Sequence, residues 1–309
     1  MVERKQLVLI GLGKMGAAIG THLVEQGYTV HGYDRSSTMR TAAAGCGILV
    51  HDSIEDAITA QMGIKVVWIM VPTANVSSVI AKVRKKLSKD DVIIDGGNSF
   101  FKDSIHRHHD LAAEDIHFID CGTSGGVTGA RFGASLMVGG DKEVIEKHKE
   151  VFTDLAVADG FGHVGEAGAG HFVKMVHNAI EYGMMGAIAE GINILDEHQE
   201  GLGLDIHEAL KPYQHGSIIE SKLMDWIVSA YHTEGYLEKI AGEVPQGKTE
   251  MDMEYLAAHE NVRVLDAALM QRKLSRLKPN FIGTLIAAMR HQFGGHTVLN
   301  KERASDTKK

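Results

Sequence analysis

The first half of the chain alternates short, continuous apolar runs with amphipathic runs, and this alternation restricts the possible folds more than any other feature. A strand that is apolar on both faces must be covered on both, and helices between successive strands provide that cover. The pattern therefore predicts an α/β fold with a doubly wound parallel sheet. The expected strands are 7–10, 29–33, 66–71, 92–95, 117–120 and 135–138, and the expected helices lie near 14–26, 53–61, 74–87, 102–113 and from 141 onward.

The second half of the chain differs, because the alternation stops near residue 164 and amphipathic helices follow one another. We expect an α/β domain over 1–164, an all-α C-terminal domain over 165–300 and a polar, disordered tail over 301–309. The helices expected in the second domain are 168–198, 205–213, 217–229, 250–259, 262–275 and 282–292.

Composition excludes several classes of partner. The chain has 309 residues and a formal net charge of −8, so it has no basic excess with which to bind nucleic acid or an anionic membrane. Its cysteines, Cys46 and Cys121, have no metal-ligand spacing and do not suggest a disulfide framework. A strand-like run begins at Gln6 without a preceding signal peptide, and no apolar run is long enough to span a bilayer. We therefore expect a cytoplasmic protein.

A G-x-G-x-x-G motif, Gly11-Leu12-Gly13-Lys14-Met15-Gly16, joins the first expected strand to the first expected helix. The motif alone is weak evidence, but in this context it indicates a Rossmann-type dinucleotide-binding domain. The glycines allow a tight turn and close approach of a pyrophosphate, and the helix N-terminus offers N–H groups and a positive dipole. We expect all six residues to contact the dinucleotide; the alternative is a glycine-rich turn without a ligand.

The second expected strand ends at Asp34 and Arg35, where the preference between NAD and NADP is usually decided. Asp34 can accept hydrogen bonds from the ribose hydroxyls of NAD and repel the 2′-phosphate of NADP. Arg35 complicates this reading, because an arginine can stack on adenine or pair with that phosphate, and Asp34 could instead cap the next helix. We favour NAD, with NADP possible. Val71 and Pro72 are expected beside the nicotinamide ribose.

The predicted helix 170–182 has an unusual polar face, behind a glycine-rich approach formed by Gly165, Gly168 and Gly170. At about 100° per residue, one face gathers an amine, an imidazole, an amide and a carboxylate within two turns. Such a face predicts part of an active site; the alternative is a solvated face with an i,i+7 ion pair. The polar face consists of Lys174, His177, Asn178 and Glu181, and the face expected to be buried consists of Phe172, Val173, Val176 and Ile180.

Two further segments follow strands at what the fold predicts is one edge of the sheet. Asp95-Gly96-Gly97-Asn98-Ser99 ends the strand at 92–95, and Ser124-Gly125-Gly126 follows the strand at 117–120. Ligands of open α/β sheets bind outside the carboxyl ends of the strands. We therefore expect these segments to converge with residues 11–16 and with the helix that carries Lys174.

These motifs resemble the β-hydroxyacid dehydrogenase superfamily and, within it, the decarboxylating 6-phosphogluconate dehydrogenase family in its short bacterial form. The resemblance covers nearly the whole chain. Relatives that act on 3-hydroxyisobutyrate or tartronate semialdehyde share the glycine motif, Ser124-Gly125-Gly126 and the lysine. They usually have Lys-x-x-Asn-Asn where this chain has Lys174-x-x-His177-Asn178, and they lack the pair Glu181-Tyr182.

The resemblance implies oxidative decarboxylation of 6-phospho-D-gluconate to D-ribulose 5-phosphate and CO₂, a reaction of the pentose phosphate pathway. Lys174 is implied as the base that takes the 3-hydroxyl proton, which requires burial and nearby cations to lower its pKa. The same lysine, once protonated, can donate to the 3-keto oxygen while CO₂ leaves. Glu181 is implied as the acid that protonates C1 of the enediol. No metal is required, and the sequence has no convincing metal-binding cluster.

The resemblance also implies a homodimer or homotetramer whose C-terminal segment contributes to the partner's site. The loop Gly247-Lys248-Thr249-Glu250 departs from the Gly-Lys/Arg-Trp-Thr that the family usually has there, so Thr249 is out of register by one residue. The residues implied for the acid end of the substrate are Asn98, Ser124, Gly125, Gly126, His177 and Asn178, and those for the phosphate end are Tyr182, Lys248, Arg272 and, from the neighbouring subunit, Arg290 and His296.

Two other functions stay open on the sequence. A 3-hydroxyisobutyrate-type dehydrogenase would act on an unphosphorylated hydroxy acid, and Lys248, Arg272 and Arg290 would then not converge on one pocket. A regulatory protein could keep the dinucleotide domain as a sensor, but it would not need a proton-transfer pair such as Lys174 and Glu181.

Overall fold

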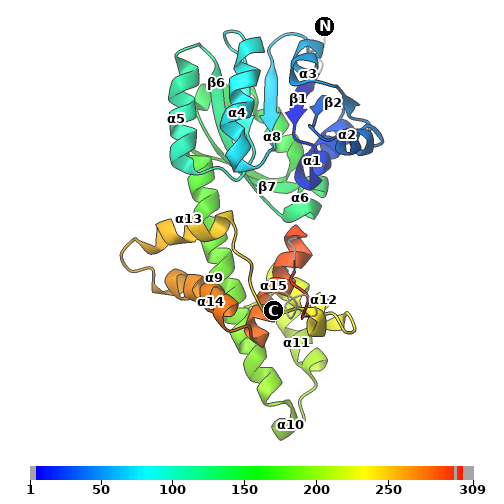
Figure 1. Ribbon diagram of the computed structural model, residues 1–309, viewed down its shortest axis with the longest axis vertical. Coiled ribbons are helices and arrows are strands. Elements are labelled where there is room, and N and C mark those ends of the chain that lie inside the picture. The colour runs from blue at the N-terminus through cyan, green and yellow to red at the C-terminus, as the bar shows by residue number, and fades with distance from the viewer. Residues whose placement is uncertain (1–4, 296–297, 302–309) are drawn as a thin grey trace, which may run out of the picture. The chain divides into compact units, whose positions relative to one another are not determined.

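The computed structural model describes residues 5–295 and 298–301 of the chain. The chain divides into two compact units, Met1–Lys174 and Met175–Lys309. Figure 1 shows the elements of each unit, with strands confined to the first. No helix within the described ranges is both long and apolar enough to cross a membrane.

The first unit is built on one eight-stranded sheet with the order β3-β2-β1-β4-β5-β6-β7-β8. The first six strands are mutually parallel, which confirms the predicted doubly wound sheet. β7 runs antiparallel to β6, and β8 is parallel to β7, so the last two strands reverse direction. The strands are β1 Gln6–Ile10, β2 Thr29–Tyr33, β3 Leu49–Val50, β4 Val66–Ile69, β5 Val92–Asp95, β6 His117–Ser124, β7 Ala134–Gly139 and β8 Ala156–Gly165.

Helices cover both faces of this sheet, because successive side chains of β1 enter two different apolar clusters. Leu7 and Leu9 belong to a cluster with Ile19 of α1, whereas Val8 and Ile10 belong to one with Ile58 of α3. All four β1 side chains are at most 2% exposed, as expected for a strand covered on both sides. The helices are α1 Lys14–Glu25, α2 Ser37–Ala44, α3 Ile54–Ala60, α4 Thr73–Val83, α5 Phe101–Ala112, α6 Gly126–Phe132, α7 Lys142–Lys147 and α8 Lys149–Leu155, with a 3₁₀ turn η1 at Arg84–Lys86.

Several short elements of the first unit were not predicted from the sequence. β3 has only two residues, and β8 is exposed or half-buried throughout and has no continuous apolar run. α2 begins after Ser36, whose hydroxyl accepts a hydrogen bond from Met39 N, and α6 is a single short helix after β6. The charged helix expected from residue 141 is two helices that meet at His148.

The second unit is helical, as predicted. Side chains cap three of its helices: Asp205 accepts from His207 N, Ser221 from Met224 N and Asn280 from Gly283 N. Residues 302–309 of the expected tail lie outside the described part of the chain. The helices are α9 Ala169–Glu197, which begins in the first unit, α10 Gln199–Leu202, α11 Ile206–Gln214, α12 Lys222–His232, α13 Lys248–Ala257, α14 Arg263–Leu277 and α15 Phe281–Gly294, with a 3₁₀ turn η2 at Leu237–Lys239.

The expected burial of one face of α9 is wrong in part. Ile180 is 51% exposed, and the deeply buried positions are instead Met175, Ala179, Tyr182 and Met185. The reason is that α9 packs on α14 through a face that includes its glycines. A Cβ added to Gly186 would lie 2.7 Å from Gln271 Oε1, so this glycine permits a close helix contact.

Candidate active site

The glycine motif forms the turn between β1 and α1, and its three glycines have different surroundings. Gly11 has a φ of +97°, and a Cβ there would lie 2.5 Å from the Met70 carbonyl oxygen. A Cβ on Gly16 would overlap the Gly11 carbonyl oxygen, so both glycines are required by packing. Gly13 has nothing within 4 Å of an added Cβ, so its backbone is open to a ligand. The turn leads into the N-terminus of α1, whose first N–H groups are a suitable site for a pyrophosphate, while the Leu12 side chain is buried in the core.

Asp34 links the end of β2 to this turn. One carboxylate oxygen accepts from Leu12 N at 2.8 Å and the other from Ser36 N at 2.8 Å. Ser36, and not Asp34, is the N-cap of α2, so the carboxylate is not explained as a helix cap. Each oxygen has a second lone pair with which it can accept from a ribose hydroxyl.

Two arginines lie near Asp34 and differ in their contacts. Arg40 donates to the Asp34 carbonyl oxygen at 2.8 Å and pairs with Asp52 at 3.1 Å. Arg35 is exposed and has no ion pair among the described residues. Arg35 therefore keeps the freedom to approach an adenine or a phosphate that Arg40 lacks.

The loop after β5 is held by the buried carboxylate of Asp95. It accepts from Gly97 N at 3.1 Å, from the Ser99 hydroxyl at 2.7 Å and from Arg107 at 3.1 Å. These bonds fix the backbone on both sides of Asn98, whose side chain is exposed. The result is a rigid loop that presents one amide at the carboxyl edge of the sheet.

The loop after β4 lies beside the loop of Asn98. Pro72 is the N-cap of α4, and the Thr73 hydroxyl donates to the Asn98 carbonyl oxygen at 2.7 Å. Val71 is half-buried and Pro72 is exposed. The hydrogen bond ties the two loops together, so Val71, Pro72 and Asn98 lie at one edge of the sheet.

The turn after β6 brings Ser124, Gly125 and Gly126 to this same edge. β5 and β6 are parallel neighbours with Asp95 opposite Asp120, and β6 continues in the same direction beyond the end of β5 to Ser124 before it turns. Gly125 and Gly126 have φ values of +113° and +63°, conformations that favour glycine. α6 then begins at Gly126.

The aliphatic part of the Lys174 side chain packs against β6, the strand that precedes this turn. A Cβ on Gly122 of β6 would overlap Lys174 Cβ, so the lysine packs directly against the strand backbone two residues before Ser124. Lys174 is half-buried. Within the first unit, the structure thus brings the lysine to the strand that supplies the Ser-Gly-Gly turn.

The following turns of α9 carry the other polar groups of the predicted face. His177 Nδ1 lies 3.3 Å from Asn178 Oδ1 and 3.7 Å from Glu181 Oε2. Asn178 is buried, and the Glu181 side chain is 20% exposed. Lys174 and Glu181 are seven residues apart on one helix, a rise of about 10 Å. The face therefore carries an amine and a carboxylate separated by two turns.

Two buried arginines of the second unit converge on Tyr182. The guanidinium carbon of Arg272 lies 4.0 Å from the centre of the Tyr182 ring, and that of Arg290 lies 5.9 Å from it. Both donate to the Pro245 carbonyl oxygen, at 3.5 and 3.2 Å. Arg272 also donates to the Thr249 hydroxyl at 3.2 Å, so the threonine that is out of register with the family's usual loop sequence still contacts this arginine.

Burial of these two arginines leaves part of their hydrogen-bonding capacity unused in the part of the chain that the structure describes. Arg272 is fully buried and Arg290 is 5% exposed, and desolvation lowers the pKa of Arg272. The Nε atoms of both are buried and have no hydrogen-bond partner within the described residues. Buried guanidinium N–H groups are normally satisfied, and carboxylate or phosphate is their usual partner.

Two residues beside this arginine pair, Glu250 and Arg276, were not predicted from the sequence. Glu250 is 1% exposed and accepts from Arg276 at 2.9 and 2.7 Å, with Arg272 at 3.8 Å. Lys248, at the start of α13, pairs with Asp252. The spacing of Arg272 and Arg276, four residues apart on a helix, was the available signal, because such residues share one face.

The contribution of Arg290 to a neighbouring subunit's site stays a prediction, and within its own chain this arginine lies beside Tyr182. Arg290 contacts Tyr182 and Pro245 of its own chain, because α15 packs against α12 and α14 within the second unit. His296 lies outside the described residues.

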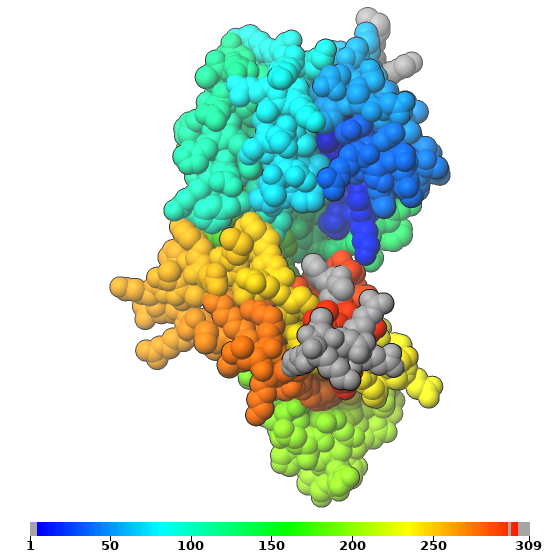
Figure 2. All heavy atoms as spheres, in the orientation of Figure 1, coloured from blue at the N-terminus to red at the C-terminus, as the bar shows by residue number. Residues whose placement is uncertain are grey.

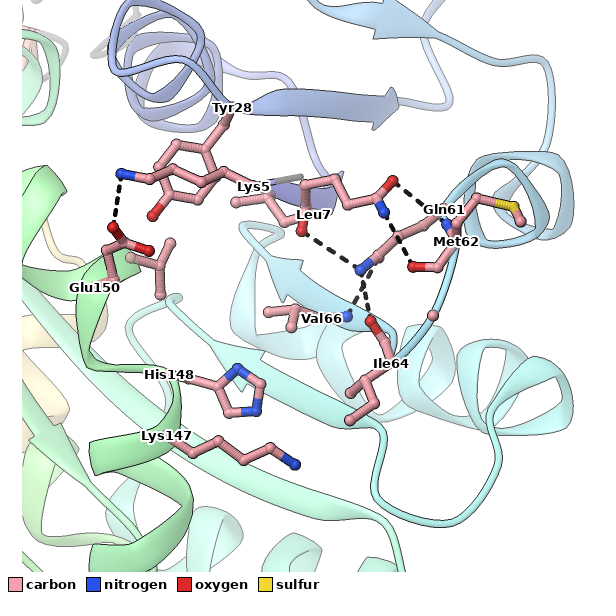
Figure 3. Close-up of a pocket in the computed structure, with 13 residues that line it drawn as sticks. Lys5, Leu7, Tyr28, Gln61, Met62, Ile64, Val66, Lys147, His148 and Glu150 are labelled. Carbon is pink, nitrogen blue, oxygen red and sulfur yellow. Dashed lines mark hydrogen bonds and ion pairs between the residues drawn. The ribbon is translucent and has the colours of Figure 1, made fainter. Parts of the chain in front are cut away.

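Two hollows lie away from all of these residues. One, of about 380 Å³, lies at the amino ends of β1 and β4, the sheet edge opposite the glycine turn (Figure 3). Lys5 pairs with Glu150 there at 2.9 Å, and the Gln61 amide donates to the Ile64 carbonyl oxygen at 2.8 Å. The second, of about 870 Å³, lies in the second unit near His207. Within residues 5–295 and 298–301, no three His, Cys, Asp or Glu side chains are grouped to hold a metal ion.

Comparison with known families covers most of the chain. A family model described as the NAD binding domain of 6-phosphogluconate dehydrogenase matches residues 6–165, and one described as the 6-phosphogluconate dehydrogenase C-terminal domain matches residues 170–280. These matches confirm the predicted cofactor class, a nicotinamide dinucleotide.

Relatives from two organisms align over nearly their full length. The Bacillus subtilis protein YqeC, provisionally named a 6-phosphogluconate dehydrogenase, is 38% identical over 296 residues, 95% of this chain and 99% of YqeC. The NAD-dependent decarboxylating 6-phosphogluconate dehydrogenase of Haloferax volcanii is 36% identical over 302 residues, 96% of this chain and 99% of that protein.

Solved structures agree in fold. The 6-phosphogluconate dehydrogenase of Plasmodium falciparum superposes with a TM-score of 0.77 at 26% identity, over 88% of this chain and 62% of that longer one. The 3-hydroxyisobutyrate dehydrogenase of Mycobacterium tuberculosis superposes with a TM-score of 0.68 at 22% identity, over 93% of this chain and all of that one. The second likeness extends to the fold alone.

Proposed function

The chain belongs to the 6-phosphogluconate dehydrogenase family, and from this premise we propose that it oxidatively decarboxylates 6-phospho-D-gluconate to D-ribulose 5-phosphate and CO₂, in the pentose phosphate pathway. The proposal goes beyond family membership because it names the substrate and the roles of this chain's own residues.

The observation that carries the proposal is the pair of buried arginines at Tyr182. Within the described residues the Nε atoms of Arg272 and Arg290 have no acceptor, and a phosphate would supply acceptor oxygens and negative charge for them. An unphosphorylated hydroxy acid gives these two guanidinium groups no equivalent partner at the end remote from its carboxylate. The cluster therefore favours a phosphorylated substrate over the 3-hydroxyisobutyrate-type alternative.

The cofactor we propose is NAD, held by residues 11–16 and Asp34, with Val71, Pro72 and Asn98 on the nicotinamide side. When bound, the dinucleotide accepts a hydride from C3 of the substrate. Asp34 supports NAD because its carboxylate is fixed at the end of β2 and would repel a 2′-phosphate. Arg35 is the residue that would favour NADP instead.

Lys174 is proposed as the base for the 3-hydroxyl, since removal of that proton must accompany oxidation of C3. The 3-keto acid so formed is a β-keto acid, and it loses CO₂ when its carbonyl is polarised. The protonated Lys174 can donate to this carbonyl oxygen. Its stem on the backbone of Gly122 supports this role, because a base must be held in a fixed position.

Glu181 is proposed to protonate C1 of the enediol that decarboxylation leaves. Glu181 lies on the same face of α9 as Lys174, two turns later. This position supports a second proton transfer, to C1, separate from the one at the C3 hydroxyl. The acid end of the substrate is assigned to Asn98, Ser124, Gly125, Gly126, His177 and Asn178, and the phosphate end to Tyr182, Lys248, Arg272, Arg290 and His296.

We also propose that the protein is a homodimer or homotetramer. Large apolar side chains are exposed on α9 and α14 of the second unit, including Ile180, Met184, Met270 and Leu274. α14, in orange, lies at the surface in Figure 2. Apolar side chains grouped on a surface are typical of an interface, and a second copy would bury them. Sedimentation across a range of protein concentrations would reveal a lone monomer if this is wrong.

The substrate proposal is tested by following reduced nicotinamide in the presence of 6-phosphogluconate, gluconate or 3-hydroxyisobutyrate, with NAD or NADP. We expect turnover with 6-phosphogluconate and a kcat/KM lower by at least about 10²-fold with gluconate, which lacks the phosphate. Equal activity with gluconate, or activity with 3-hydroxyisobutyrate alone, would refute the proposal.

A further inference from the structure

A buried hydrogen-bonded cluster lies beneath the first turn of α9, one helical turn before Lys174. Its side chains come from three elements, Asp120 of β6, Ser104 of α5 and His171 of α9, and none is more than 2% exposed. None of the roles proposed above uses these residues.

Asp120 caps α9 from a strand. Its Oδ1 accepts from Gly168 N at 2.6 Å, and its Oδ2 accepts from His171 N at 2.7 Å. α9 begins at Ala169, so both N–H groups belong to the start of a helix, where they have no acceptor within the helix. A carboxylate here also interacts favourably with the helix dipole. The first turn of α9 is thereby fixed to β6.

His171 attaches the same turn to a second element. Its Nδ1 lies 2.7 Å from the Ser104 hydroxyl of α5 and 3.9 Å from Asp120 Oδ2. Burial raises the pKa of Asp120, and His171 together with the two backbone N–H groups opposes that shift. Asp95 on the neighbouring strand is the other carboxylate that acts on Asp120.

The backbone contacts around this cluster leave α9 little room to move. A Cβ on Gly170 would lie 2.5 Å from the Met137 carbonyl oxygen and 2.6 Å from that of Asp120. Asp120 and Gly122 are alternate residues of β6, so they lie on one face of the strand, about 7 Å apart. One holds the start of the helix and the other supports the stem of Lys174.

We infer that Asp120 and His171 are positioning residues for Lys174: they fix the first turn of α9 on the sheet and so set where the lysine amine meets the substrate. The inference rests on the proposed role of Lys174 as the base. Misplacing a catalytic group by about 1 Å can reduce turnover about 10²-fold while binding is retained.

Asp91 provides a matched control in the same unit. It is 5% exposed and, like Asp120, accepts two backbone hydrogen bonds, from Lys65 N and Ser88 N, both at 2.7 Å. It lies before β5, at the amino edge of the sheet, away from α9. Asp91→Ala should therefore lower stability as Asp120→Ala does, but it should leave the position of Lys174 unchanged.

The test compares Asp120→Ala, Asp120→Asn, His171→Asn and Asp91→Ala for thermal stability, NAD affinity, KM and kcat. We expect Asp120→Ala to lose about 10²-fold in kcat, with KM and NAD affinity within about threefold of the unmodified protein. Asp120→Asn, which keeps one acceptor oxygen, should recover part of kcat, and Asp91→Ala should keep it. If Asp120→Ala does not fold, Asp120→Asn and His171→Asn provide the same comparison.

Two results would overturn the inference. In the first, the Asp120 and His171 variants lose no more kcat than Asp91→Ala does at an equal loss of stability. In the second, these variants change KM and leave kcat unchanged. Lys174→Met in the same series separates this failure from that of the proposed function. Turnover by Lys174→Met would refute the base itself, whereas an inactive Lys174→Met with normal kcat in Asp120→Ala would refute only the positioning role.

Discussion

We propose that the glycine turn of the first unit and the arginine cluster of the second each bind a phosphate group, but by opposite physical means. The turn uses backbone: its glycines allow close approach, and the start of α1 supplies N–H groups and a dipole without a buried side-chain charge. The cluster uses side chains: Arg272 and Arg290 are buried around Tyr182, and Glu250 lies nearby. A backbone site requires only a local sequence, whereas a side-chain site requires distant residues to meet.

The largest difference between the two regions should appear when Arg272 is replaced by methionine. We expect kcat/KM for 6-phosphogluconate to fall about 10²- to 10³-fold, because the substrate phosphate loses a buried guanidinium partner, while NAD affinity is unchanged. Steady-state kinetics and NAD titration provide the two values. Arg84→Met, which removes an arginine paired with Glu114 on the surface, is the control and should change neither. An unaltered KM in Arg272→Met would remove the arginine from the phosphate site.

The glycine turn should respond differently at two of its positions. Gly13→Ala should leave the free energy of unfolding nearly unchanged, because nothing lies within 4 Å of the added Cβ, yet weaken NAD binding about tenfold or more. Gly16→Ala should destabilise the protein by about 1–3 kcal/mol, because its Cβ overlaps the Gly11 carbonyl oxygen. Urea unfolding and NAD titration distinguish the two effects. Normal NAD affinity in Gly13→Ala would mean that the open backbone is not the pyrophosphate site.

Cofactor choice should be a smaller effect at the same end of the molecule. Asp34→Ala should reduce the ratio of kcat/KM for NAD to that for NADP about tenfold, because the carboxylate that repels the 2′-phosphate is gone. Asp56→Ala, which removes an exposed carboxylate from α3, should leave the ratio unchanged. If Asp34→Ala also leaves it unchanged, Asp34 serves only to hold the turn.

The smallest expected effect is on stability at acid pH. Burial lowers the pKa of His31, whose Nδ1 lies 3.1 Å from Nε2 of His51, so the folded state favours neutral His31. The contribution of neutral His31 to the free energy of unfolding is therefore complete above the ordinary histidine pKa of about 6.5. It is lost as the pH falls through the lower pKa that His31 has in the folded state. The difference in melting temperature between the unmodified protein and His31→Gln should therefore become smaller as the pH falls below about 6.5. A constant difference across that range would contradict the assignment, and the exposed His106→Gln should show no such trend.

The difference between sites built from local sequence and sites built from distant residues explains how much could be predicted from the sequence. The strands and most helices followed from apolar periodicity, and residues 11–16 from a local motif, because each depends on neighbours in the chain. β8 was missed because its residues are partly exposed and lack an apolar run. The arginine cluster joins Tyr182, Glu250, Arg272 and Arg290 from four helices, and no local pattern predicts that meeting. Resemblance to a family pointed to Tyr182, Arg272 and Arg290, but not to Glu250 beneath them.

The proposed reaction couples oxidation of a phosphorylated substrate to loss of CO₂. The most direct measurement counts reduced nicotinamide and released CO₂ in the same reaction with 6-phosphogluconate, for the unmodified protein and for Lys174→Met. We predict equal amounts of the two products from the unmodified protein, and turnover lower by at least about 10³-fold, with NAD still bound, in Lys174→Met. Reduced nicotinamide without an equal amount of CO₂, or normal turnover in Lys174→Met, would contradict this account.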